Sequence, residues 1–145
     1  MQHNPDDAMA LLSRTPAALN AFLRDLPETW TFRNEGRGTW IPSEVVAYLI
    51  YGERRDCIPR TKIILQFGET RKFEPFDRAG HVRESQGKSL PQLLDEFARL
   101  RAKSLDQLRA MNLGAEDLAR HGRHPAFGPV TLRGPQRLTN ALLSN

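Results

Sequence analysis

An apolar stripe runs through residues 90–111 and needs other helices to cover it. Leucine, phenylalanine and methionine recur there at spacings of three and four residues. These positions are Leu90, Leu93, Leu94, Phe97, Leu100, Leu105, Leu108 and Met111. The spacing matches the 3.6 residues of an α-helical turn, so it predicts an amphipathic helix with one face on a core. Ser89 is a favoured N-cap residue, and Gly114 is predicted to end the segment.

An N-terminal segment carries the same helical period. It begins after Asp6 and ends at Pro27. Its apolar positions are Met9, Leu12, Leu19, Phe22, Leu23 and Leu26. Thr15 and Pro16 interrupt the pattern, either as a kink or as an N-cap followed by proline at the first helical position.

A second early segment begins at Pro42 and Ser43, a pair typical of a helix start, and continues to Gly68. Pro59 is predicted to bend or restart it. Residues 28–39 and 69–87 are polar and predict loops, the second of them anchored by Phe73 and Phe76.

The C-terminal end predicts only fragments of structure. Residues 115–120 are expected to form one helical turn, and residues 121–131 are rich in turn residues. Thr131 is predicted to cap a last short helix, although Gly134 and Pro135 lie in its first turn. No alternation long enough to predict a strand occurs. We therefore expect an all-α helical bundle with an incomplete or short fourth helix, in one domain over residues 1–145.

Composition excludes several classes of protein. Cys57 is the only cysteine, which rules out an intrachain disulfide and a cysteine-rich zinc site. The net charge of +4 comes from 21 basic and 17 acidic side chains, so no nucleic-acid partner is expected. No apolar run approaches the roughly 20 residues that span a bilayer, and the polar N-terminus does not resemble a signal peptide. A cytoplasmic location is expected.

Several stretches carry a resemblance to a known family. They are Gly38–Asp56, Phe73–Arg78, Glu84-Ser85, Gly87–Leu90, Leu93–Arg101 and Gly122–Pro125. Their order and spacing resemble those of DinB/YfiT-like proteins of the DinB superfamily, from about Leu11 to Leu132. The resemblance implies a four-helix bundle that holds a divalent metal, zinc or nickel, through one histidine of the second helix and two of the fourth. It also implies thiol-dependent transferase or isomerase activity and dimers.

This sequence departs from the family pattern at the metal ligands. The resemblance places Tyr48 at the second-helix histidine position, and residues 133–145 contain no histidine. We therefore predict that no metal or other cofactor is bound. His3, His81, His121 and His124 are interpreted as histidines of a terminus, loops or turns.

The candidate catalytic residues are weak. Tyr48 could donate a proton or simply fill the place of an imidazole, and Cys57 could be a nucleophile or a half-buried structural residue. Glu53, Arg54 and Arg55 either line a pocket, together with Trp40 and Tyr48, or form a solvated helix end.

Three hypotheses about function follow. The first is a degenerate family member without strong catalytic activity. The second is a metal- or thiol-dependent S-transferase or isomerase that acts on a small thiol or electrophile through Tyr48, Glu53 and Cys57. The third is a non-enzymatic binding or dimerisation module. A homodimer is expected in addition, because a short fourth helix would leave part of the 90–111 stripe exposed.

Overall fold

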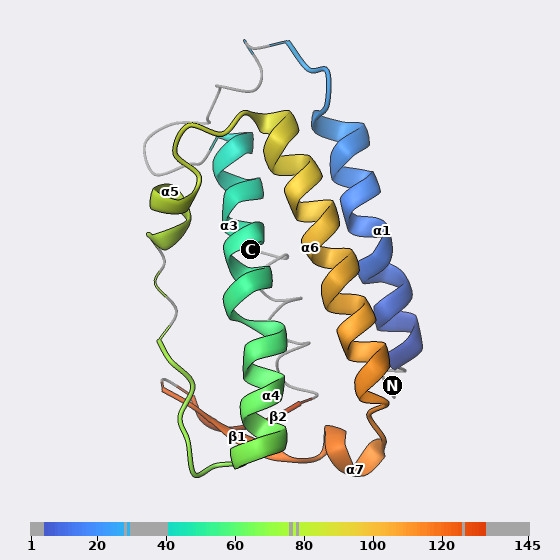
Figure 1. Ribbon diagram of the computed structural model, residues 1–145, viewed down its shortest axis with the longest axis vertical. Helices are drawn as coiled ribbons and strands as arrows, with labels where there is room; N and C mark the ends of the chain where they lie inside the picture. Colours follow the sequence, from blue (N-terminus) through green and yellow to red (C-terminus); the bar gives the residue numbers. More distant parts are fainter. Residues whose placement is uncertain are drawn as a thin grey trace. The chain divides into compact units, whose positions relative to one another are not determined.

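The computed structural model describes residues 5–27, 29, 41–75, 77, 79–125 and 127–132. The chain divides into two compact units. The first comprises Met1–Glu53 with Arg78–Asp106, and the second Arg54–Asp77 with Gln107–Asn145. The elements, drawn in Figure 1, are α1 (Pro5–Leu23), α3 (Pro42–Arg55), α4 (Cys57–Phe67), α5 (Gly80–Glu84), α6 (Leu90–Met111), α7 (Ala115–Leu118), β1 (His121–His124) and β2 (Gly128–Thr131). The single domain predicted over residues 1–145 stays a prediction.

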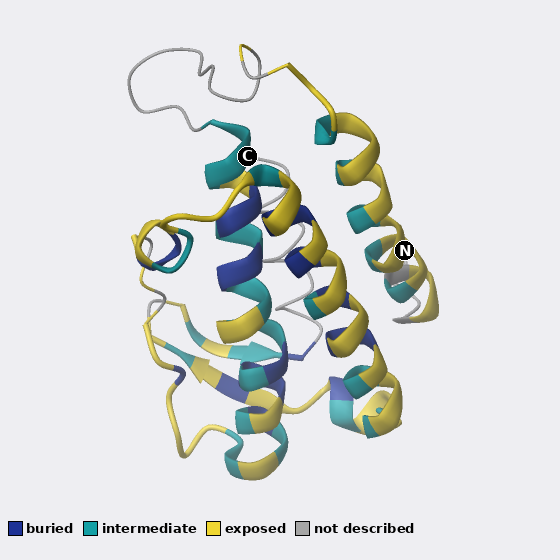
Figure 2. Ribbon diagram, turned by 45° about the horizontal axis from the view of Figure 1, so that its top comes forward, coloured by how far each residue is buried: buried dark blue, intermediate teal, exposed yellow. Residues whose placement is uncertain are grey.

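Three long helices build the core of the first unit. The buried residues are Val46, Ala47 and Ile50 of α3 and Leu93, Leu94 and Phe97 of α6. Leu19 and Leu23 of α1 pack against them, and the buried faces of α3 and α6 are visible in Figure 2. Burial of this kind stabilises the fold by about 25 cal/mol per Å² of apolar surface. The predicted helical stripe of residues 90–111 is confirmed.

The burial of the α6 stripe contradicts our reason for expecting a homodimer. We expected part of the α6 stripe to be exposed, yet Leu93, Leu94, Phe97 and Leu105 are buried and the other four stripe residues are at least half-buried. The part of this face from Leu90 to Leu100 packs against α3 and α1. The homodimer stays a prediction, now without that reason for it.

Helix α1 continues through Pro16 without a break, so the predicted alternative of an N-cap at Thr15 is wrong. Proline has no N–H, and the carbonyl of Leu12, four residues earlier, therefore lacks its helical donor. The guanidinium of Arg101 on α6 donates to this carbonyl at 3.0 Å. A residue of another helix thus satisfies the carbonyl oxygen that Pro16 leaves open.

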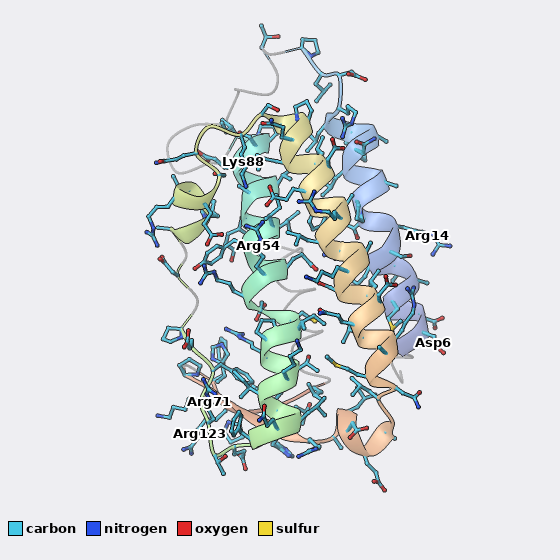
Figure 3. All side chains as sticks on the ribbon, in the orientation of Figure 1. Asp6, Arg14, Arg54, Arg71, Lys88 and Arg123 are labelled. Carbon is cyan, nitrogen blue, oxygen red and sulfur yellow. The ribbon has the colours of Figure 1, made fainter. Side chains whose placement is uncertain are left out.

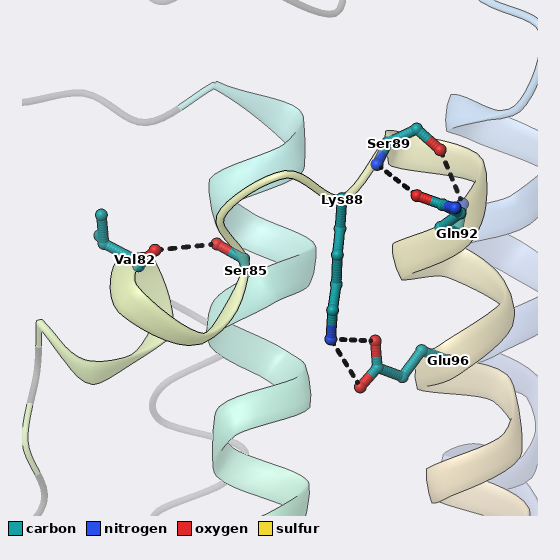
Figure 4. Close-up of polar contacts among 6 residues, drawn as sticks. All are labelled: Val82, Ser85, Lys88, Ser89, Gln92 and Glu96. Atoms are coloured by element: carbon teal, nitrogen blue, oxygen red, sulfur yellow. Dashed lines mark hydrogen bonds and ion pairs between the residues drawn. The ribbon is translucent and has the colours of Figure 1, made fainter.

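Helix α6 begins with the cap that the sequence predicts. The N–H of Gln92 donates to the Ser89 hydroxyl at 3.3 Å, and the N–H of Ser89 donates to the Gln92 side chain at 2.9 Å (Figure 4). This reciprocal pair is a capping box. At the other end, α6 stops at Met111 and Asn112 has a positive φ of 48°. Gly114 therefore does not end α6; it precedes α7, and its N–H donates to Asp117 at 3.1 Å.

Replacing Ser89 by alanine is expected to lower the free energy of unfolding by about 1 kcal/mol, the usual cost of losing an N-cap oxygen. Ser85→Ala is the matched control, because the Ser85 hydroxyl reaches the Val82 carbonyl only at 3.4 Å (Figure 4). Urea unfolding followed by circular dichroism measures both. Equal effects of the two substitutions would contradict the capping role of Ser89.

Helix α4 belongs to the second unit and follows an interruption of the helix at Asp56. Helix α3 ends at Arg55 and α4 starts at Cys57, which places Pro59 in its first turn, where proline is tolerated. Gly68, with φ of 56°, ends α4. The predicted restart near Pro59 and the predicted stop at Gly68 are both confirmed.

The core of the second unit gathers Ile64, Phe73, Leu118 and Leu132. Phe73 is 2% exposed, so the prediction that it anchors the 69–87 connection is confirmed. Phe76 lies outside the described residues, as does most of the loop predicted over residues 28–39. The helical turn predicted over residues 115–120 is confirmed by α7.

A β-hairpin that the sequence analysis missed completes this unit. Strands β1 and β2 pair antiparallel, with His121 opposite Thr131 and His124 opposite Gly128. Thr131 therefore ends a strand. Its predicted role as a helix cap stays a prediction, because the helix that it would cap lies outside the described residues. Each strand has only four residues, too few for a period of two to stand out. The fourth helix predicted beyond Thr131 falls on residues 133–145, outside the described residues.

Candidate functional site

The position that the family resemblance assigns to a ligand histidine is Tyr48, in the middle of α3. Its ring meets the imidazole of His81 edge-on, with the ring centroids 5.4 Å apart and the planes at 90°. His81 is 4% exposed and lies on α5. Its interpretation as a loop histidine is therefore wrong. A lone histidine among polar residues gives no periodic signal, so only the packing of α5 reveals its burial.

Close packing beside this ring pair holds α5 against α3. A Cβ atom at Gly80 would lie 2.5 Å from ring atoms of Tyr51, which is 5% exposed. Only glycine allows an approach this close. Gly80 and His81 thus pack α5 against the face of α3 that carries Tyr48 and Tyr51.

Two ion pairs belong to the first unit, and the pair between Glu53 and Arg101 is buried. The carboxylate of Glu53, a candidate catalytic residue, accepts from Arg101 at 2.8 Å, and both side chains are at most 10% exposed. Figure 4 shows Lys88 reaching Glu96 on α6 at 2.9 Å. The sequence did not suggest either pair, because the partners are separated by 48 and 8 residues. Glu53 is committed to a structural partner.

The other candidate residues belong to the second unit or lie outside the described residues. Cys57 is half-buried in the first turn of α4, where its carbonyl accepts from the Thr61 hydroxyl at 2.7 Å. Arg54, labelled in Figure 3, and Arg55 are exposed at the end of α3. Trp40 lies outside the described residues. Exposure of the two arginines favours the solvated helix end over the pocket.

The histidines of the hairpin differ from each other in environment. His121 is exposed, whereas His124 is half-buried and accepts a hydrogen bond from the backbone N–H of Phe127 at 3.2 Å. Burial lowers the pKa of His124, the charge of Arg60 lowers it further, and the charge of Asp56 opposes both. His3 lies outside the described residues.

The residues described by the structure bring together no group of three His, Cys, Asp or Glu side chains suited to a metal ion. At Tyr48 the available donors are one phenol and one imidazole in ring contact. A phenol has an ordinary pKa near 10 and is a poor ligand at neutral pH. This donor set does not fit the three-histidine metal site that the resemblance implies.

The fold and this site define a class of protein: a helical protein with a small hairpin, in which Tyr48, in the middle of α3, contacts the imidazole of His81 on α5. The chain belongs to the DinB superfamily, whose sequence profile matches residues 11–141. No curated protein matches the sequence.

Among solved structures, the chain is similar to YfiT from Bacillus subtilis, described as a probable metal-dependent hydrolase with an unusual four-helix bundle topology. The TM-score is 0.73 at 20% identity, over 94% of this chain and 78% of that chain. The likeness establishes the fold, so the predicted four-helix bundle is confirmed. Within the described residues, no helix combines the length and apolarity needed to cross a bilayer.

Proposed function

We propose that this chain is a DinB-superfamily protein whose ancestral metal position has become a packing site, so that it lacks the metal-dependent activity of its relatives. The observation that carries the proposal is the edge-on contact between Tyr48 and His81 at 5.4 Å. An edge-to-face pair of rings contributes about 0.5–1.5 kcal/mol beyond its buried area. The pair therefore stabilises the bundle at the position where relatives place a ligand.

The distribution of donor residues supports the same proposal. A catalytic zinc site needs three protein ligands and an open position for water or substrate. Residues 133–145, the part of the expected fourth helix that this sequence includes, contain no His, Cys, Asp or Glu. Glu53, a nearby carboxylate on α3, is held by Arg101.

The second candidate function is a metal-dependent hydrolase, which the printed description of YfiT favours. It would require ligands other than those of the family pattern. The hypothesis of a thiol-dependent transferase needs Tyr48, Glu53 and Cys57 to act together. Cys57 belongs to the second unit, and Tyr48 and Glu53 belong to the first. Glu53 is already paired with Arg101, which disfavours a catalytic role for its carboxylate.

Metal analysis tests the proposal. Protein purified without a histidine tag, incubated with zinc or nickel and dialysed, is expected to retain well under one equivalent by mass spectrometry. Tyr48→His is the matched variant, and it is expected to remain substoichiometric because one added imidazole still leaves fewer than three ligands. Stoichiometric metal in the unmodified protein after dialysis would overturn the proposal and favour the hydrolase.

A further inference from the structure

The imidazole of His124 is the centre of a small cluster in the second unit. His124 ends β1, and the backbone N–H of Phe127 donates to its Nδ1 across the hairpin turn at 3.2 Å. The Phe127 ring tilts over the imidazole with centroids 4.7 Å apart. On its other side, the buried ring of Phe73 meets the imidazole edge-on at 6.3 Å. His124 thus joins the turn to the core residue beneath it.

The hydrogen bond defines the protonation state of the ring. Nδ1 can accept only when it carries no proton, so the bonded imidazole is neutral with its proton on Nε2. A second proton would convert Nδ1 into a donor that faces the N–H of Phe127. The turn would then lose the hydrogen bond from the N–H of Phe127 to His124.

The two charged groups that act on the ring most directly, Arg60 and Asp56, lie on or next to α4. On β1 itself, Arg123 and His121 are exposed. Arg60, which is 7% exposed, lies over the ring of Phe73 at 5.2 Å and forms an ion pair with Asp56 at 2.9 Å. Strand β2, which pairs with β1, carries no titratable side chain. Lys72 and Glu74, on either side of Phe73, are exposed. A protonated imidazole would therefore face the guanidinium of Arg60, with the carboxylate of Asp56 in partial compensation.

We propose that His124 is a pH-sensitive latch that holds the hairpin turn closed at neutral pH and releases it on acidification. When this hydrogen bond is lost, Phe127 moves away from the imidazole, and the contact of the imidazole with the ring of Phe73 loosens. The surface that changes is apolar, because Phe127 is already 66% exposed in the closed state. Mild acid therefore increases the exposed aromatic surface of the second unit.

The direction of the pH effect follows from the pKa of His124. Burial and Arg60 lower this pKa in the folded chain relative to its ordinary value near 6.5. The folded state consequently binds the proton more weakly than the unfolded state. The stabilising contribution is complete above about pH 6.5 and is lost as the pH falls through the lowered pKa.

Hydrogen exchange of the Phe127 amide tests the latch. The exchange rate is measured by NMR between pH 7.5 and 5 and is corrected for intrinsic exchange. The protection of this amide is expected to fall about three- to tenfold on acidification, the range given by one net hydrogen bond. The amide of Gly68, which donates to Ile64 at the end of α4, is the internal control and should stay constant. Unchanged protection of Phe127 over this range would overturn the proposal.

Two variants separate the latch from general acid sensitivity. His124→Gln is expected to give low protection of Phe127 that no longer depends on pH, whereas His121→Gln, at an exposed position of the same strand, should keep the pH profile of the unmodified protein. A pH-dependent loss that persists in His124→Gln would assign the effect to another group.

If His124→Gln does not fold, Asp56→Asn provides the test. Removing the charge that raises the pKa of His124 should move the midpoint to lower pH, and an unmoved or raised midpoint would contradict the latch.

Discussion

Replacement of Arg101 by methionine is expected to lower the free energy of unfolding by about 3–5 kcal/mol, the cost of leaving a buried charge without its partner. The guanidinium of Arg101 is the common partner of the Glu53 carboxylate and the Leu12 carbonyl. It also lies over the ring of Phe97 at 5.0 Å. The substitution keeps most of the side-chain volume but leaves both oxygens without this donor, and the Arg101 and Glu53 side chains are only 5% and 10% exposed.

Chemical denaturation of matched variants checks this result. Arg99→Met, two residues earlier at an exposed position of α6, should change the stability by less than about 0.5 kcal/mol. The double variant Glu53→Met/Arg101→Met removes both charges, and it should be more stable than Arg101→Met alone. If Arg99→Met were as harmful as Arg101→Met, the buried ion pair would not be the cause.

Gly122→Ala is the second substitution with a large expected effect. A Cβ atom at this position of β1 would lie 2.4 Å from Cγ1 of Ile64 and 2.8 Å from Cζ of Phe73. Both neighbours are buried core residues of the second unit, so neither can move aside freely. Overpacking of this kind costs about 1–3 kcal/mol.

Gly52→Ala is the control for Gly122→Ala, because no atom lies within 4 Å of the Cβ that it would add. Gly52 is inside α3, where alanine is favoured over glycine by about 0.5–1 kcal/mol. Thermal unfolding should therefore show Gly122→Ala below the unmodified protein and Gly52→Ala at or above it. Two variants with the same melting temperature would contradict the close approach of β1 to α4.

The sequence alone was sufficient to predict those elements that depend only on residues close to one another in the chain. The stripe of α6, its cap at Ser89 and the stop of α4 at Gly68 each depend on a few neighbouring residues, and the structure confirms all three. The hairpin was missed because its four-residue strands are shaped by pairing with each other and by the core beneath Gly122. Tertiary contact overrides weak local preference in such segments.

The candidate site was predicted only at the position that the family pattern indicates. Tyr48 was chosen by resemblance, but its neighbour His81 is 33 residues away and has no periodic context. Glu53 was a candidate for catalysis because its partner Arg101 lies 48 residues away and the sequence pattern does not indicate the ion pair. Long-range pairings of polar groups depend on how the helices pack. The local pattern of a single sequence does not show which helix faces meet.

Pro16 in α1 affects the order in which hydrogen bonds can form during synthesis of the chain. The carbonyl oxygen of Leu12 acquires its donor only when Arg101 has been made, 89 residues later. At about 5–20 residues per second, a ribosome needs roughly 4–18 s to add that length of chain. During this interval water, rather than protein, must solvate the oxygen. The N-terminal helix therefore emerges from the ribosome with a hydrated gap in its hydrogen-bond ladder, which closes when the helix that carries Arg101 arrives.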